Sequence, residues 1–403
     1  MNKVVDLIFV CIIFLLSSCR QAATDQEVLS SMESSDQIIT VDNTKKYIQI
    51  PYDSLFQKSY NIVPLATDDA HLIGAIDRIA LTDSSLFILD KPRNTVYVYT
   101  RGGDFVRAIS HVGGGPEEYQ SLTDFTLDTA NNHIILYTDR PKRLMTYTMD
   151  DIFVSSKSIS PLLENISFDP ESKTLIGFNR SPTYKDYFMF YNLLGETAGS
   201  FLTIDHDNPI ESLFHDYRIE YPFLIRSKGV YCVFPYLNTV FKLEKGYAKK
   251  VWTVDFTRVP EEKSFVDIDA RGIVMEVIKE NLGFLLGNFS ETQDFVSFSF
   301  GRGTKVVHAK DTEKRVVFDL LYNSEANFYH SNHFAHDDFT SAADDRSYIF
   351  KEETFNLVQY YRDMKLNDPK SWQNIDMRIK DLLENKEEED NPILFFYTLK
   401  DTL

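Results

Sequence analysis

Short apolar runs alternate with polar turns along most of the chain, which predicts many β-strands joined by tight turns. The clearest unit has four such runs, at residues 76–81, 86–90, 95–99 and 105–109. A second unit follows in the same order and places Asp139 at the position of Asp90. Four short strands in a repeat of about 45–50 residues are typical of one blade of a β-propeller.

Looser units continue toward the C-terminus, and their boundaries are least regular between residues 160 and 270. A four-stranded sheet cannot bury both of its faces alone, so blades complete their cores by packing face to face around an axis. We therefore expect an all-β propeller over residues 45–403.

Two helical patterns interrupt the strands and predict two short helical insertions. The first has apolar residues at 273, 274, 277 and 278. The second follows Asp368-Pro369, a suitable N-cap and first helical residue, and has apolar residues at 372, 375, 379, 382 and 383.

A strand-like run at 392–397 predicts that the ring closes by pairing the C-terminus with a strand near the N-terminus. Closure of this kind removes exposed sheet edges. The candidate partner strands are residues 47–50 and 62–65.

The first 19 residues resemble a secretory signal. Lys3 provides a positive charge, and Leu7–Leu16 is an unbroken apolar run of ten residues. This run is too short to span a bilayer core of about 30 Å, which needs roughly 20 residues. Leu16-Ser17-Ser18-Cys19 resembles the lipobox of bacterial lipoproteins. We expect residues 1–18 to be a signal peptide and Cys19 to be acylated; the alternative is an ordinary cleavable signal with a coincidental cysteine.

Residues 19–44 are predicted to form a flexible, lipidated tether, because they are mostly polar. Two or more acyl chains anchor a soluble domain to a membrane stably. Arg20, rather than an aspartate, follows Cys19, which by resemblance to the usual lipoprotein sorting rule favours the outer membrane. The sequence leaves open whether the protein faces the periplasm or the cell surface.

Composition supports a folded domain and argues against one class of partner. Hydrophobic residues make up 43% of the chain and charged residues 25%, a balance that supports a buried core. The 31 Phe and 22 Tyr favour strands packed in sheets. The net charge of −18 argues against a nucleic-acid partner, whose phosphate backbone binds basic surfaces.

The three cysteines predict no disulfide in the mature chain. Cys11 leaves with the signal and Cys19 carries lipid, so Cys232 remains alone. It lies in the apolar run 230–234, which favours a buried, unreactive thiol over a nucleophile.

Four motifs occur in order along the chain: Ile62-Val63-Pro64-Leu65, Gly113-Gly114-Gly115-Pro116-Glu117-Glu118-Tyr119, Asn288-Phe289-Ser290-Glu291-Thr292 and Asn391-Pro392-Ile393-Leu394. In these motifs the chain resembles the six-bladed β-propeller lipoproteins of Bacteroides and related gut bacteria, relatives of the NHL-repeat propellers. The resemblance implies six blades and a lipid anchor. It implies no established activity.

His330, His333 and His336 form an H-x-x-H-x-x-H motif in a segment that fits a loop ahead of the sixth blade. On a helix the three side chains would diverge, but in a loop they could converge on Zn²⁺. The alternative is a set of solvated loop histidines. No other cofactor is expected, although Ca²⁺ remains a second candidate ion.

Arg93, Arg140 and Arg143 follow the strands that carry the aligned aspartates, so they are predicted to lie on one rim. A guanidinium binds a carboxylate through two parallel hydrogen bonds, so this rim could hold a carboxylate or an acidic sugar. The alternative is exposed charge in turns. Tyr184, Tyr187 and Tyr191 could likewise stack on sugars, although their strand positions favour core packing.

The glycine cluster 113–115 is interpreted as a turn between blades rather than a phosphate site. It lacks the Lys-Ser/Thr ending of a P-loop and is followed by Pro116-Glu117-Glu118, whose charges repel phosphate. The sequence also has no G-x-S-x-G motif for a nucleophilic serine.

The favoured interpretation is a non-enzymatic lipoprotein, attached to the membrane by lipid, whose propeller loops bind a glycan, a peptide or an envelope protein. One alternative is a metal-dependent hydrolase or lyase, because lactonases and lyases occur among propellers of this fold. Another is a structural subunit of a nutrient-uptake complex, which predicts an exposed apolar patch.

Overall fold

The computed structural model describes residues 37–160, 162–179, 185–203, 224–227, 229–234, 237–244, 247–261, 270–284, 286–301, 303–330, 340–341 and 347–403. The chain divides into two units, Met1–Ser35 and Asp36–Leu403, and all of the described residues belong to the second. The predicted signal peptide and Cys19 lie outside the described residues.

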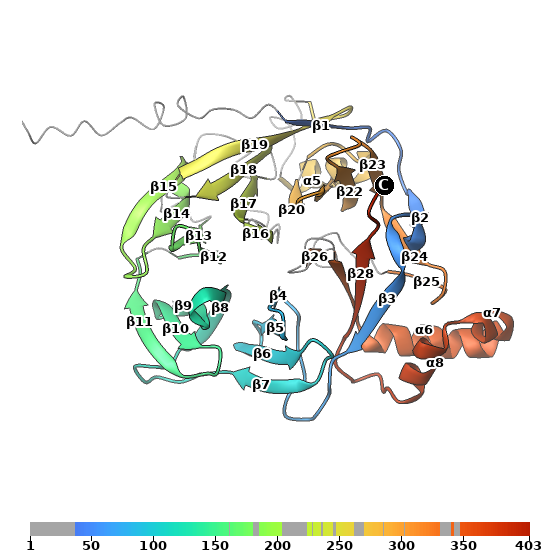
Figure 1. Ribbon diagram of the computed structural model, residues 1–403, viewed down its shortest axis with the longest axis horizontal. Coiled ribbons are helices and arrows are strands. Elements are labelled where there is room, and N and C mark those ends of the chain that lie inside the picture. Colours follow the sequence, from blue (N-terminus) through green and yellow to red (C-terminus); the bar gives the residue numbers. More distant parts are fainter. Residues whose placement is uncertain are drawn as a thin grey trace, which may run out of the picture. The chain divides into compact units, whose positions relative to one another are not determined.

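Sheets of short strands follow one another around a ring (Figure 1). Blade one contains β4 (Arg78–Leu81), β5 (Ser85–Asp90), β6 (Thr95–Thr100) and β7 (Phe105–Ile109). Blade two contains β8 (Ser121–Asp128), β9 (His133–Arg140), β10 (Lys142–Thr148) and β11 (Phe153–Ser158). Blade three contains β12 (Asn165–Asp169), β13 (Thr174–Phe178), β14 (Asp186–Tyr191) and β15 (Thr197–Thr203).

The later blades recruit strands from the start of the domain. Blade four contains β16 (Leu224–Ser227), β17 (Gly229–Phe234), β18 (Leu237–Glu244) and β19 (Tyr247–Phe256), and β1 (Ile38–Val41) pairs in parallel with β19. Blade five contains β20 (Gly287–Glu291), β21 (Phe295–Phe300), β22 (Thr304–Ala309) and β23 (Arg315–Phe318). The closing blade contains β26 (Thr340–Ser341), β27 (Ser347–Glu352), β28 (Ile393–Leu399) and β3 (Phe56–Pro64).

The expected number of six blades was wrong, because the described residues form seven sheets. The additional blade has three strands, β2 (Gln49–Pro51), β24 (Leu320–Asn323) and β25 (Phe328–Tyr329). The sequence pattern missed it because β25 has only two residues and β2 ends in a proline, which cannot donate a ladder hydrogen bond.

The ring closes by antiparallel pairing of β28 with β3, which confirms the prediction of a C-terminal closing strand. Ile393 is opposite Pro64, and Leu394 is opposite Val63, so the candidate partner at 62–65 was correct. The other candidate, at 47–50, was wrong: Gln49 and Ile50 belong to β2 and pair in parallel with β24.

The first described residues run along the outside of several blades before they reach β3. We call residues 37–51 the N-terminal strap. Part of this strap, up to residue 44, falls within the predicted tether, yet it contains β1, whose Ile39 and Val41 are fully buried. The structure therefore places residues 38–41 in a sheet.

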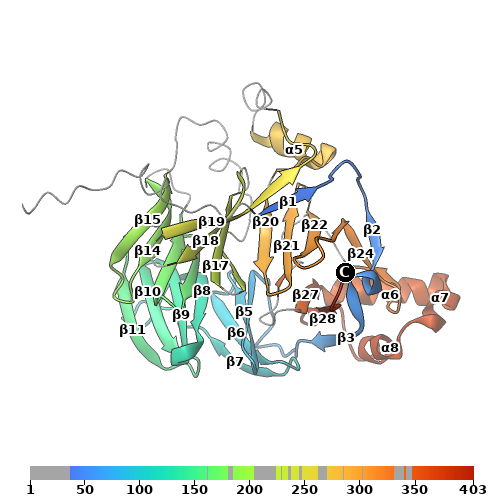
Figure 2. The ribbon, with the colours of Figure 1, turned by 45° about the horizontal axis from the view of Figure 1, so that its top comes forward.

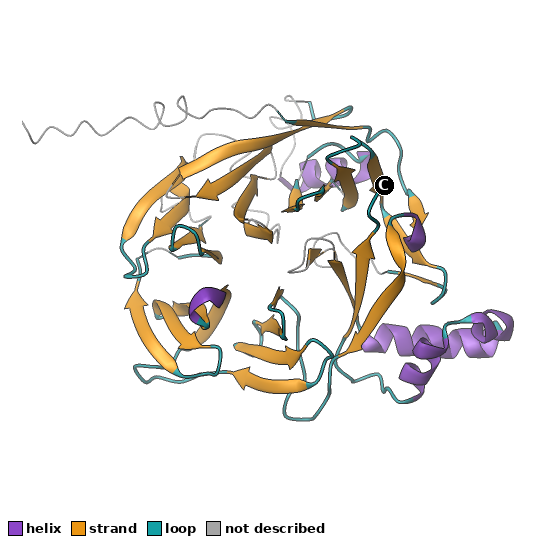
Figure 3. Cartoon of the chain, in the orientation of Figure 1, coloured by secondary structure: helices purple, strands orange, loops and turns teal. Residues whose placement is uncertain are grey.

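Among the described residues, α-helices lie in two regions, and the other helical turns in Figure 3 are 3₁₀ helices. The first is α5 (Ala270–Glu280), which confirms the first predicted insertion and stands beyond the end of β20 in Figure 2. The second comprises α6 (Thr354–Asn367), α7 (Pro369–Asn374) and α8 (Met377–Glu384). The Asp368 side chain caps α7 by accepting from the Ser371 amide, as the sequence predicted. The described residues also contain two short 3₁₀ helices, η1 (Tyr52–Ser54) and η2 (Thr129–Asn131).

No helix within the described ranges is both long enough and apolar enough to cross a membrane.

The hydrophobic core lies between neighbouring blades, as face-to-face packing requires. Phe87 and Val98 of blade one are buried with Phe125, Leu136 and Met145 of blade two. Another buried cluster joins the closing blade, the three-stranded blade and α6, and includes the tyrosines Tyr52, Tyr60, Tyr348, Tyr361 and Tyr397. Blades packed in this way hold their inner strands in fixed positions. The candidate site lies on three of these inner strands, β4, β8 and β12.

Candidate functional site

A charged network joins the inner strands of three consecutive blades. Arg78 is the first residue of β4, which lies at the inner edge of blade one (Figure 1). Its Nη1 donates to Asp124 Oδ2 at 2.5 Å and to the Phe125 carbonyl at 2.8 Å, both on β8. The same nitrogen lies 3.1 Å from the carbonyl oxygen of Ile166, on β12. One guanidinium nitrogen thus joins blades one, two and three.

Asp124 is the buried partner in this network. Its side chain is only 1% exposed, and its Oδ2 also accepts from the Ile166 amide at 2.7 Å. Its Oδ1 is buried and has no hydrogen-bond partner among the described residues. Because Oδ2 is bonded to blades one and three, the carboxylate fixes the position of the arginine.

The remaining donors of Arg78 are available. Nε and Nη2 make no hydrogen bond to the described residues, and the side chain is 16% exposed. These two nitrogens form one straight edge of the planar guanidinium, the edge that binds a carboxylate through two parallel hydrogen bonds. The centroid of the Phe125 ring lies 5.7 Å from Arg78 Cζ, within the range of a cation–π contact.

Side chains of β8 also satisfy the unpaired inner edge of β12. Thr126 Oγ1 accepts from the Phe168 amide at 3.1 Å, one repeat beyond the bond from the Ile166 amide to Asp124. An edge strand presents alternate amides to its surroundings, and these need acceptors when they are buried. Two alternate residues of β8 supply them, so the inner edges of blades two and three are held together.

The predicted arginine rim is dispersed over two equivalent turns. Arg93 lies between β5 and β6, with its Nε 3.7 Å from Asp90 Oδ2. Arg143 donates to the Pro116 carbonyl at 3.3 Å, while the Arg140 side chain is exposed and makes no hydrogen bond or ion pair to the described residues. Arg93 thus lies in a turn, whereas Arg140 ends β9 and Arg143 belongs to β10, and each side chain has its own surroundings.

That loop contains the glycine cluster and connects β7 to β8, as the sequence predicted. The Gly115 amide donates to Glu118 Oε2 at 2.7 Å, and the Gly113 amide donates to the Tyr119 carbonyl. The loop therefore holds its own carboxylate where a phosphate site would need a free amide.

His330 lies in the core rather than in solvent. It is 1% exposed; its Nδ1 is 2.7 Å from Glu352 Oε1, and its Nε2 is 2.6 Å from the Tyr397 hydroxyl. Both ring nitrogens are engaged, so a metal ion would have to displace one of these bonds. His333 and His336 lie outside the described residues. Among the residues described, no three His, Cys, Asp or Glu side chains gather closely enough to hold a metal ion.

Cys232 and two of the candidate tyrosines are buried. Cys232 is fully buried in β17, and burial raises the pKa of its thiol well above the ordinary value, which favours the unreactive form. Tyr187 and Tyr191 lie in the core of blade three, which confirms core packing for them. Tyr184 is outside the described residues.

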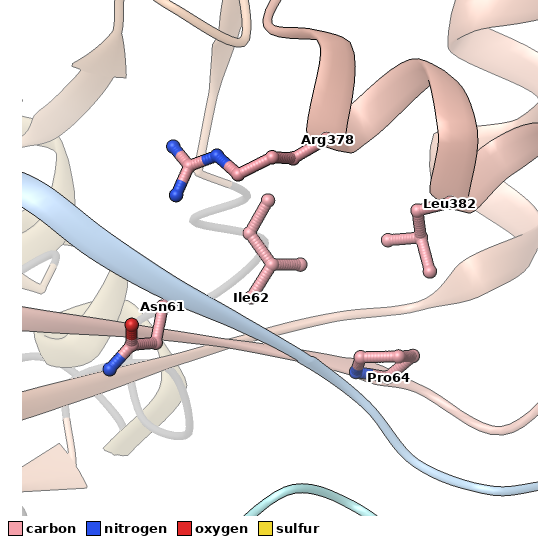
Figure 4. Close-up of a pocket in the computed structure, with 5 residues that line it drawn as sticks. All are labelled: Asn61, Ile62, Pro64, Arg378 and Leu382. Carbon is pink, nitrogen blue, oxygen red and sulfur yellow. The ribbon is translucent and has the colours of Figure 1, made fainter.

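A pocket of about 280 Å³ lies between β3 and α8 (Figure 4). It is lined by Asn61, Ile62, Pro64, Arg378 and Leu382. The Arg378 guanidinium donates from Nε to Asp376 Oδ2 at 2.9 Å and from Nη1 to the Tyr60 carbonyl at 3.0 Å. Both edges of this guanidinium are occupied within the protein, so the pocket offers weaker anion recognition than Arg78 does.

Sequence reasoning missed Arg78 because its partners are distant along the chain. Asp124 is 46 residues away and Ile166 is 88 residues away. The available signal was a charged residue that begins an otherwise apolar first strand of a blade, together with Asp124 at the corresponding strand of the next blade.

The sequence and the fold both resemble those of known proteins. Residues 36–398 match the family described as Domain of unknown function (DUF4934). A Bacteroides fragilis protein described as exported has a crystal structure that aligns with a TM-score of 0.69 and 18% identity, covering 91% of this chain and 100% of that chain. At this identity the likeness shows the β-propeller fold alone.

A second solved structure, a member of the DUF4221 family from Bacteroides vulgatus, aligns at 10% identity and a TM-score of 0.49, covering 86% of this chain and 97% of that chain. No curated protein matches the sequence.

Proposed function

The chain belongs to the family described as Domain of unknown function (DUF4934), and we propose that it is a binding protein in which Arg78, at the inner edge of blade one, holds a carboxylate-bearing ligand. The observation that carries the proposal is the open Nε–Nη2 edge of Arg78, in a network fixed by three blades. A guanidinium held in one orientation loses less entropy when it binds a planar carboxylate.

The proposed ligand class is an acidic glycan or a peptide with a free C-terminus, since both present a carboxylate. The molecule carries a net charge of −18, so its overall field does not attract such ligands. Recognition must therefore come from the short-range contacts of Arg78, which makes this residue the decisive one to change.

Calorimetric titration tests the proposal with matched probes. Trigalacturonate carries carboxylates that neutral galactotriose lacks. Trialanine carries a C-terminal carboxylate that trialanine amide lacks. We expect an acidic probe to bind and its neutral match not to bind. The charged hydrogen bonds at stake contribute about 1.5–3 kcal/mol each, so Arg78→Gln should weaken binding at least about tenfold. Arg78→Lys should restore only part of this loss, because lysine lacks the two-donor edge.

The triple change of Arg93, Arg140 and Arg143 to glutamine is the control. It should leave affinity within about twofold. If this triple variant loses binding while Arg78→Gln keeps the wild-type affinity, the ligand binds at the three rim arginines. That result would overturn the inner-edge site. Equal affinity for acidic and neutral probes would overturn carboxylate recognition altogether. Melting temperatures of all variants establish that they fold.

We further propose that the protein acts in the bacterial cell envelope, anchored to the outer membrane through lipid on Cys19. The N-terminal sequence supports this, and one protein of the same fold is described as exported. Metabolic labelling with an alkyne fatty acid should label the wild-type protein and leave Cys19→Ala unlabelled. Equal labelling of both would refute acylation at this position.

A further inference from the structure

Three tyrosines gather where the three-stranded blade meets the second helical region. Tyr322 lies on β24, Tyr329 on β25 and Tyr360 on α6. Tyr329 is 46% exposed and Tyr360 is 43% exposed, whereas most of the tyrosines that the structure describes lie in the core. We call these three residues the tyrosine platform.

Contacts of two kinds link the three side chains of the platform. Tyr322 and Tyr329 are directly opposite each other across β24 and β25, with ring centroids 4.9 Å apart and planes inclined by 41°. Directly opposed residues of an antiparallel pair project from the same face of a sheet. Tyr360 is linked to this pair through Asn327, because its hydroxyl and the Tyr322 hydroxyl both donate to that residue. The pKa of Tyr360 is raised, first by burial and then by electrostatic interaction with Tyr322 and Tyr329.

Amide groups of the protein fix all three rings. The Tyr322 hydroxyl donates to Asn327 Oδ1 at 2.5 Å, and the Tyr360 hydroxyl donates to the Asn327 carbonyl at 2.6 Å. The Tyr329 hydroxyl donates to Gln49 Oε1 at 3.0 Å, which ties it to β2. Asn327 has a φ of 54°, a left-handed conformation that asparagine adopts more readily than most residues. The rings are therefore ordered before any ligand arrives.

This arrangement has a definite chemical character. The three hydroxyls are already bonded within the protein, and the Tyr329 and Tyr360 side chains remain partly exposed. The groups that bond the hydroxyls are amides rather than charged side chains. Rigid aromatic rings beside uncharged amides suit a ligand with an apolar C–H face and hydroxyl groups at its edge, which describes a pyranose ring.

We propose that the tyrosine platform is a binding site for a neutral oligosaccharide, whose pyranose rings stack on Tyr329 and Tyr360. This site is separate from the inner-edge site and does not depend on it, since the two recognise different chemistry through different blades.

Saturation-transfer NMR and calorimetry with cellotetraose and maltotetraose test the proposal on the full-length protein. We expect one of them to bind wild-type protein. Tyr329→Ala and Tyr360→Ala should each weaken this binding about tenfold, because each removes one stacking surface. Tyr329→Phe keeps the ring and should stay within about threefold of wild type. The matched control is Phe355→Ala, which removes another exposed aromatic ring of α6 outside the platform.

Two results would overturn the proposal. One is no detectable binding of either sugar at 10 mM, which is about ten times a Kd of 1 mM. The other is binding that survives both alanine variants or is lost equally in Phe355→Ala. If Tyr360→Ala lowers the melting temperature, its affinity is not interpreted. The affinities of Tyr329→Ala and Tyr329→Phe then show whether the aromatic ring binds the sugar. Binding of trigalacturonate at Arg78 should be unchanged in Tyr329→Ala, so the two sites can fail separately.

Discussion

Single buried asparagines attach the connecting segments of this propeller to its sheets. Asn391 is 2% exposed; its Nδ2 donates to the carbonyls of Ala66 and His71, and its Oδ1 accepts from the Ile73 amide. Asn43 acts similarly and donates to the carbonyls of Arg258 and Asn281. A short amide side chain supplies donors and an acceptor together, so one residue satisfies several backbone groups of a segment that has no sheet partner.

Replacement of Asn391 by alanine should therefore destabilise the protein strongly. The change leaves the partly buried Ile73 amide and two carbonyls without their bonds to Asn391, which predicts a loss of about 2–4 kcal/mol in the free energy of unfolding. Urea denaturation measures it. Asn385→Ala, which removes one exposed bond to the Asp381 carbonyl, is the control and should cost under about 0.5 kcal/mol. Similar losses in both variants would refute the role of Asn391.

His308 predicts a pH dependence of stability. Its side chain is 1% exposed, its Nδ1 has no partner among the described residues, and burial lowers the pKa of the imidazole below 6.5 despite the opposing effect of Glu313. Below that pH the unfolded chain binds a proton that the folded protein does not. The contribution to stability is thus complete above pH 6.5 and is lost as the pH falls through the folded-state pKa.

Urea denaturation between pH 7.5 and 5.0 checks this expectation. One proton accounts for a slope of at most about 1.4 kcal/mol per pH unit. His308→Phe should flatten the slope below pH 6.5, whereas His133→Phe, which leaves His308 in place, should keep it. If His308→Phe leaves the dependence of unfolding free energy on pH unchanged, other titratable groups cause that dependence.

At the scale of elements, β1 shows how a short strand attaches to an existing blade. Its residues alternate between exposed and buried, so Ile39 and Val41 enter the core while Ile38 is 55% exposed. The Thr253 amide donates to the Gln37 carbonyl, and the Thr257 amide donates to the Val41 carbonyl, which pairs β1 with β19 along its whole length. β1 thereby covers an edge of blade four that would otherwise be open.

Adjacent isoleucines make a matched test of this strand. Ile39→Ala should lower the free energy of unfolding by about 2–4 kcal/mol, because it leaves a cavity in the core. Ile38→Ala, at an exposed position of the same strand, should stay within about 0.5 kcal/mol of wild type. Equal effects would mean that residues 38–41 belong to a tether, as the polar composition around them had predicted.

Elements with strong local patterns were predictable, and those that depend on distant partners were not. The four strands of blade one lie where the alternation placed them, and α7 begins at the predicted Asp368-Pro369 cap. The spacing of Leu357, Val358, Tyr361 and Met364 also carries a helical signal, and it marks the buried face of α6, which was not predicted.

The three-stranded blade could not be recognised in the sequence, because β2 and β24 are far apart along the chain. The Ile48 amide, just before β2, donates to Oδ2 of Asp319, which precedes β24 and lies 271 residues further along. The same holds for the candidate site. Arg78 lies in a predicted strand, but only the ring brings Asp124 and Ile166 to it. The sequence shows that Arg78 and Asp124 are charged, but it does not show that the fold brings them together.

At the scale of the whole molecule, closure by β3 and β28 should matter more than the strap. A chain that starts at Tyr52 lacks β1 and β2 but keeps β3, so it should fold to a monomer with a lower melting temperature. A chain that starts at Leu65 exposes the edge of β28 and should aggregate, because unpaired apolar edges associate. Size-exclusion chromatography and thermal melting distinguish the two. A cooperative, monomeric chain from Leu65 would show that closure by β3 is dispensable.

The strap has a mechanical consequence. Its attachments follow chain order: β1 on β19, then Asn43 on Arg258 and Asn281, then β2 on β24, and only then β3 on β28. Tension applied at residue 37 therefore loads these contacts one after another, and each must separate before the force reaches the next. The ring stays closed, with its inner strands in place, under a pull that has already released the strap.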